Sequence, residues 1–115
     1  MRLILFTLIA VFTFSFNSYA QMSMPDITKL IHHDNGNIYA SDYLIIVVYD
    51  EFNNAASAKA VANYLNAEVI GGLKHKNWWQ ISVRADSLEK LNQIKDLTLE
   101  HEYVQDVIID KINKY

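Results

Sequence analysis

Cysteine is absent from this chain of 115 residues. Its absence excludes disulfides, a lipid anchor attached to a cysteine thiol, and the paired-cysteine sites of small metal-carrier domains. A small domain without cross-links is held together by burial of its own core, and at this length the core is modest. We therefore expect a single domain whose stability benefits from binding a partner.

Basic charge is also scarce, because 10 basic residues stand against 13 acidic ones, giving a net charge of −3. Domains that bind nucleic acid present a clustered basic face to the phosphates. The mild acidity of this chain therefore argues against a nucleic-acid partner.

The motifs that carry catalysis or bind metals are missing as well. The sequence has no nucleophile elbow and no zinc-binding helix motif. His75 stands between two lysines on a predicted turn, where a solvated side chain is expected. His32 and His33 are adjacent, but no third ligand follows them at useful spacing. The sequence predicts no enzyme, no metal site and no cofactor.

The longest apolar run lies at the N-terminus. Met1 and Arg2 make a positive start, residues 3–16 are almost entirely apolar, and Ser18 and Ala20 supply small residues at −3 and −1. We expect residues 1–20 to be a signal peptide cleaved after Ala20, which places the mature chain in a secreted or periplasmic location and off the membrane. The alternative, a membrane anchor, needs a longer run of roughly 20 apolar residues. Cleavage removes one basic residue, Arg2, so nine basic and thirteen acidic residues remain and the net charge becomes −4.

Residues 21–42 are expected to form a flexible lead-in. A short helical turn is predicted over residues 26–31, followed by a turn-rich segment at 32–37. Order is expected only at residues 38–41.

From residue 43 the apolar spacing changes between strand and helix periods. Strands are predicted at 43–49, 68–70, 78–84 and 104–109, the first of them apolar on both faces and therefore central. Gly71 and Gly72 indicate a bulge or bend in the second strand. The predicted fold class is α+β: a ferredoxin-like βαββαβ sandwich over residues 43–110, with a four-stranded antiparallel sheet and two helices on one face.

Two apolar stripes mark the predicted helices. In the first, Ala58, Val61, Ala62 and Leu65 fall at i, i+3, i+4 and i+7, the spacing of a helix that packs on a sheet. In the second, Leu88, Leu91, Ile94 and Leu97 recur every three residues and lie along one side of a helix. Asp86 and Glu89 have the spacing of a capping box at the start of the second helix.

Helices on one face leave the other face of the sheet open. Trp78, Gln80 and Ser82 alternate with Trp79 and Ile81, so these three residues are predicted to point away from the helices. An exposed apolar sheet face is typical of a binding surface. The alternative is that the lead-in or a second copy of the chain covers this face.

Five segments together resemble a known family of inhibitory domains. They read LIIVVYD at 44–50, ANYL at 62–65, AEVIGGL at 67–73, WQI at 79–81 and VQDVIID at 104–110. The pattern is similar to the propeptide domains of subtilisin-type serine proteases, above all the fervidolysin-type prodomains, and to the stand-alone inhibitors of the proteinase-inhibitor-nine family. The resemblance covers residues 43–115. Two departures are the His101-Glu102-Tyr103 sequence where that family often has Asp-Pro, and the lack of any protease motif.

The resemblance implies an exported inhibitor, or a folding chaperone in trans, of a subtilisin-like serine protease. In that family the sheet docks on the protease, and the C-terminal tail, here residues 111–115, lies in the substrate cleft like a product. Tyr115 would occupy the pocket next to the catalytic serine, with Lys114 and Asn113 before it and Ile112 three residues upstream. The alternatives are a frayed terminus, and an exported interaction module that binds another partner, or itself as a homodimer, through the open sheet face.

Overall fold

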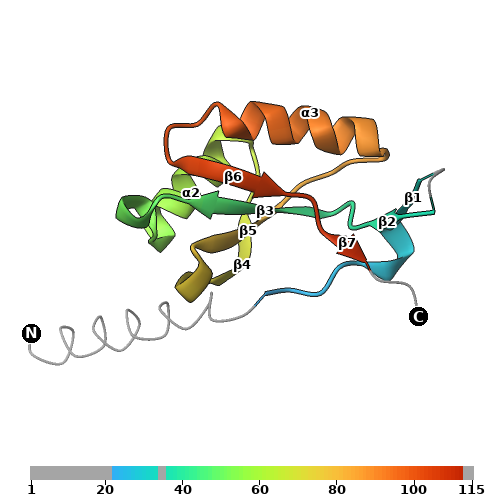
Figure 1. Cartoon of the computed structure of the whole chain (residues 1–115), viewed down its shortest axis with the longest axis horizontal. Coiled ribbons are helices and arrows are strands. Elements are labelled where there is room, and N and C mark those ends of the chain that lie inside the picture. The colour runs from blue at the N-terminus through green and yellow to red at the C-terminus, as the bar shows by residue number, and fades with distance from the viewer. Residues whose placement is uncertain (1–21, 34–35, 113–115) are drawn as a thin grey trace, which may run out of the picture.

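The computed structural model describes residues 22–33 and 36–112, which form an α+β domain with two antiparallel sheets (Figure 1). Three 3-10 turns, η1, η2 and η3, span Ile27–Lys29, Asp50–Phe52 and Lys74–Lys76. The helices are α2 (Ala55–Tyr64) and α3 (Leu88–Leu99). The strands are β1 (Ile31–His32), β2 (Ile38–Tyr39), β3 (Tyr43–Val48), β4 (Val69–Leu73), β5 (Trp78–Ser82), β6 (Val104–Ile108) and β7 (Lys111–Ile112).

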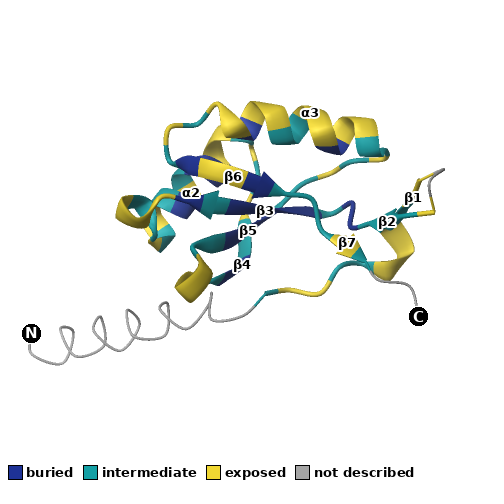
Figure 2. Ribbon diagram, viewed as in Figure 1, coloured by how far each residue is buried: buried dark blue, intermediate teal, exposed yellow. Residues whose placement is uncertain are grey.

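The larger sheet has the strand order β4-β5-β3-β6, with every neighbouring pair antiparallel. Strand β3 is central because its β-branched residues are apolar on both faces, and five of its six residues are buried. Figure 2 shows it as the most continuously buried strand. The predicted α+β class is confirmed, and the chain enters the larger sheet and its helices in the order β3, α2, β4, β5, α3 and β6.

Both helices pack on the same face of the larger sheet. Ala58, Val61 and Ala62 of α2 and Leu91 of α3 belong to one buried cluster. The strand residues in that cluster are Leu44, Ile46, Val48, Trp79, Ile81, Val104 and Val107. The small residues of α2 let its backbone lie close to the sheet. This helix face is the principal core of the domain.

The ends of the helices follow from single side chains. The Oδ1 of Asn54 accepts from the backbone N–H of Ser57 at 2.8 Å and caps α2. The cap of α3 is Ser87, whose Oγ accepts from the N–H of Lys90 at 3.1 Å, so the predicted capping box at Asp86 is wrong by one residue. A serine hydroxyl accepts this bond as readily as an aspartate carboxylate.

The buried stripe of α3 also differs at its C-terminal end. Leu97 is 46% exposed, whereas Thr98 is fully buried and its hydroxyl donates to the carbonyl of Ile94 at 2.6 Å. Thr98 lies seven residues after Leu91, which brings it back to the same helix face. Because the carbonyl of the preceding turn satisfies this hydroxyl, the polar Thr98, and not Leu97, takes the buried position at this end of α3.

The predicted bulge at the glycines is confirmed by a register shift in β4 between Val69 and Gly71. Gly72 pairs with Trp79 of β5. A Cβ at Gly72 would lie 3.1 Å from Cε3 of Trp79 and 3.2 Å from the carbonyl oxygen of Trp78. Glycine is therefore needed where the indole lies against the backbone.

The second sheet was not expected, because the sequence predicted only one. Its order is β1-β2-β7, and β2 pairs Ile38 with Ile112 and Tyr39 with Lys111. Residues 22–33 and 36–42, predicted as a flexible lead-in, therefore run beside the domain, and β2 within them pairs with the C-terminal strand β7 (Figure 1). Strands of two residues carry no periodic signal, which is why the sequence does not reveal them.

Candidate interaction surface

The candidate functional site is the face of the larger sheet opposite the helices, called the second face below. On β3 it presents Tyr43, Ile45 and Val47, which pair with Ser82, Gln80 and Trp78 of β5. Their outward direction follows from strict alternation along both strands. Tyr43 and Ile45 are almost fully buried, so something covers this face.

The cover comes from both ends of the described chain. Ala40, Tyr43 and Ile45 form a second buried cluster. The partly buried residues packed against it are Met22, Ile70, Trp78, Ile108 and Ile112. Met22 precedes the sheet in the sequence and Ile112 follows it, so segments far apart in the chain meet here.

The closest cover is an irregular segment, residues 22–26, which we call the strap. The backbone N–H of Ser23 donates to Oε1 of Gln80 at 2.6 Å, and Nε2 of Gln80 donates to the carbonyl of Ser23 at 2.9 Å. The hydroxyl of Ser23 donates to the carbonyl of Ile70 at 2.7 Å. Both polar ends of the fully buried Gln80 side chain are therefore satisfied by the strap.

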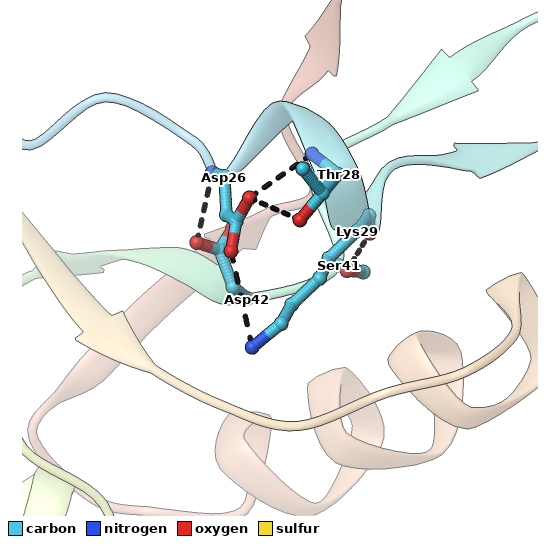
Figure 3. A network of polar contacts seen from close by, with 5 residues as sticks. All are labelled: Asp26, Thr28, Lys29, Ser41 and Asp42. Atoms are coloured by element: carbon cyan, nitrogen blue, oxygen red, sulfur yellow. Dashed lines mark hydrogen bonds and ion pairs between the residues drawn. The ribbon is translucent and has the colours of Figure 1, made fainter.

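The strap is anchored at its downstream end by the polar contacts in Figure 3. The N–H of Asp26 donates to Oδ2 of Asp42 at 3.1 Å, and Oδ1 of Asp26 accepts from the N–H and the hydroxyl of Thr28. These two bonds from Thr28 hold the pKa of the exposed Asp26 carboxyl below its usual value, with a smaller contribution from Lys29. The hydroxyl of Ser41 also donates to the carbonyl of Lys29.

The C-terminal segment leaves the sheet at Asp110. The backbone N–H of Ala40 donates to the carbonyl of Asp110 at 3.0 Å, and the Tyr43 hydroxyl donates to the Asp110 carboxylate. Burial of the phenol, and secondarily this bond to Asp110, raise the pKa of Tyr43 far above its usual value. Asp110 therefore fixes the point from which β7 runs toward β2.

Part of the second face stays open to solvent. Val47 and Trp78 lie opposite each other and are only half-buried. The Nζ of Lys76 lies over the Trp78 ring, 4.7 Å from its centroid. A cation over an indole is a modest attraction at an exposed site. The open strip is apolar with one cationic edge.

The structure separates the three predicted sheet-face residues. Trp78 borders the open strip, but Gln80 is fully buried beneath Ser23 and is not accessible to a partner while the strap is in place. Ser82 is half-buried, and its hydroxyl accepts from the N–H of Glu68 at 3.1 Å. The expectation of an open face is therefore wrong for Gln80, because the lead-in supplies its hydrogen-bond partners.

Of the predicted tail, Lys111 and Ile112 fall within the described residues, where they pair with Tyr39 and Ile38. Asn113, Lys114 and Tyr115 lie outside them. His32 is exposed on β1 and His33 is exposed beside it. Among residues 22–33 and 36–112, no group of His, Asp or Glu side chains is arranged to hold a metal ion.

Sequence reasoning missed Ser23, Asp42 and Asp110 as residues that position the cover. Asp26 followed by Thr28 is a local signal for a capped turn, and it was available in the sequence. The bond between Ser23 and Gln80 spans 57 positions and leaves no local pattern.

Comparison with protein-family models, curated proteins and solved structures found no match for this chain. Within the described part of the chain, none of the helices has the length and apolar character needed to cross a membrane.

Proposed function

We propose that this chain is an exported, propeptide-like inhibitor, or folding chaperone in trans, of a subtilisin-like serine protease. The domain would be a ferredoxin-like βαββαβ sandwich, whose second face docks on the protease while the C-terminal tail enters the substrate cleft. The chain order of β3, α2, β4, β5, α3 and β6, and the sheet order β4-β5-β3-β6, support this topology.

The single observation that carries the proposal is the path of the C-terminal segment. Strand β6 pairs with the central strand β3, and Asp110 is then held by Ala40 and Tyr43. Residues 111–112 continue in extended form beside the second face. An extended segment next to an apolar docking face is the form that pairs with the edge of a protease cleft as an added strand.

The reach of the tail is compatible with this geometry. Five extended residues span at most roughly 17 Å, which takes the chain from a docked sheet into a cleft. Tyr115 would fill the pocket beside the catalytic serine, so that the tail lies in the cleft like a product. Ile112 would exchange its pairing with Ile38 for contact with the protease.

Inhibition of a purified subtilisin by the chain from Gln21 onward tests the proposal. Deletion of residues 112–115 should weaken inhibition at least about tenfold, or ~1.4 kcal/mol. Tyr115→Gly should account for much of this loss, whereas Lys114→Ala, at a position that points out of a cleft, serves as the control. Inhibition that survives the deletion unchanged would rule out the tail mechanism, and no inhibition by the intact chain would rule out the function.

A second candidate, an exported interaction module that binds another partner or itself, is favoured by the open strip at Val47 and Trp78. Two copies that meet at this strip would form a homodimer. Sedimentation of the intact chain and of Trp78→Ser tests this reading. A dimer that the substitution dissociates supports it, and a monomer at all concentrations counts against self-association.

A further inference from the structure

The side chain of Gln80 binds the backbone of Ser23 as a neighbouring strand would. One carboxamide supplies both an acceptor for the N–H and a donor for the carbonyl of the same residue, at 2.6 and 2.9 Å. Backbone groups have the same chemistry in every residue, so this contact recognises extended peptide rather than a particular side chain. Gln80 lies at the centre of the second face and is fully buried when the strap is bound.

The strap has few other attachments. Upstream of Asp26 it forms no helix or strand, and the neighbouring Met24 is 86% exposed. Met22 packs on the second cluster, and the hydroxyl of Ser23 reaches Ile70. Segments with few buried apolar contacts open at lower free energy than the core to which they are attached. The strap is thus able to leave while η1 stays anchored through Asp26 and Asp42.

We propose that the second face at Gln80 is a binding site for an extended peptide segment, occupied in the free protein by the chain's own strap. The strap competes with the protease for this face, so docking requires its release; this part rests on the proposed function. A ligand that binds only the open state has an apparent affinity reduced by the open fraction. A strap closed for about nine-tenths of the time therefore weakens apparent inhibition about tenfold.

Ser23→Pro in the chain from Gln21 onward tests whether the hydrogen bonds of Ser23 hold the strap on the second face. Proline has no N–H to donate to Gln80, and the substitution removes the hydroxyl as well. Ser23→Ala removes only the bond to Ile70 and should have a smaller effect. Met24→Ala is the matched control on the exposed side of the strap. The side-chain amide protons of Gln80, which donate to the carbonyl of Ser23, should exchange at least about tenfold faster in Ser23→Pro, with backbone exchange in β3 and β5 unchanged. Unchanged exchange at the Gln80 side chain would show that the strap is not held by these bonds.

A synthetic peptide that copies residues 21–27 tests the binding site without any protease. It should bind Ser23→Pro, quench or shift the fluorescence of Trp78, and be at least about tenfold weaker toward the intact chain, whose site is already filled. The same peptide with proline at the position of Ser23 is the matched control and should not bind. Failure of the unmodified peptide to bind Ser23→Pro would overturn the peptide site.

The competition is then read from inhibition of subtilisin. Ser23→Pro should inhibit about tenfold more tightly than the intact chain, and Met24→Ala should inhibit equally. Tighter inhibition supports competition, and equal or weaker inhibition overturns it while leaving the inhibitor function standing. If neither chain inhibits, the proposed function and the competition both fail, while the peptide-binding result still decides the site at Gln80.

Discussion

The two faces of the larger sheet are closed in different ways. Helices α2 and α3 cover one face with stripes of apolar side chains. On β5 these side chains pack against Trp79 and Ile81. The strap, Ala40 and Ile112 of β7 cover the other face, where Gln80, Ser23 and Asp110 contribute polar contacts. Burial is nearly complete at the centre of both faces, so burial alone does not distinguish them.

The difference teaches that equal burial does not mean equal stability. A helix that packs through several side chains is lost only with the fold, whereas an irregular segment held by a few hydrogen bonds opens locally. Each net hydrogen bond contributes only about 1 kcal/mol in water. We therefore expect the helix face to determine global stability and the second face to determine what the domain binds.

The largest expected difference between the two faces comes from truncating two neighbouring side chains of β3, one on each face. Ile46 is fully buried toward the helices, and Ile45 is 4% exposed toward the strap. Ile46→Ala should lower the free energy of unfolding by about 4 kcal/mol, and Ile45→Ala by about 2 kcal/mol, because the strap can collapse into the gap and the helices cannot. Urea denaturation of both variants measures the two values.

The pair is internally controlled, because both substitutions remove the same atoms from the same strand. Equal losses would show that the strap packs as rigidly as the helices. A larger loss at Ile45 would reverse the comparison and place the principal core on the second face.

The helix face was predictable because its signals are periodic and local. The stripe from Ala58 to Ala62, the stripe beginning at Leu88 and the alternation around Trp79 each require only a few neighbouring residues. The errors on this face, at Asp86 and Leu97, arise where one side chain substitutes for another in the same geometric role. Periodicity gives the position of an element more reliably than the residue that caps it.

The second face was only half predictable. Alternation gives the direction of Trp78, Gln80 and Ser82, since it needs no knowledge of what lies above the strand. What covers them depends on contacts between residues far apart, such as Ser23 with Gln80 and Ile38 with Ile112. Such contacts follow from the closed path of the chain and have no local pattern, so the strap and the second sheet were not foreseen.

A second way to sharpen the comparison is to overfill the helix face at Gly72. A methyl group there meets the buried Trp79 ring at 3.1 Å and the backbone of Trp78 at 3.2 Å, and neither can move without disturbing β5. Gly72→Ala should cost about 1–3 kcal/mol of unfolding free energy. Thermal and urea unfolding measure the loss. A neutral or stabilising result would mean that the indole has room to shift and that the helix face is less tightly packed than the structure indicates.

The smallest expected effect concerns the polar contact that closes the second face, and its pH dependence gives it a distinct signature. Folded Tyr43 stays protonated, because burial disfavours the phenolate and because the negative charge would lie beside Asp110, whereas the unfolded tyrosine ionises near pH 10.0. The unfolded state therefore releases a proton that the folded state keeps, so this contribution to stability is full below pH 10.0 and is lost as the pH rises above it.

Tyr43→Phe should cost about 1 kcal/mol near neutral pH. The difference from the wild-type protein should then shrink above pH 10.0, by up to about 1.4 kcal/mol per pH unit. Urea unfolding across this range measures the two curves, with Tyr64→Phe, at a position 45% exposed, as the control that should follow the wild type. Parallel curves for Tyr43→Phe and the wild-type protein would show that neither burial nor Asp110 keeps the folded phenol protonated, and that this end of the second face is more open than the structure indicates.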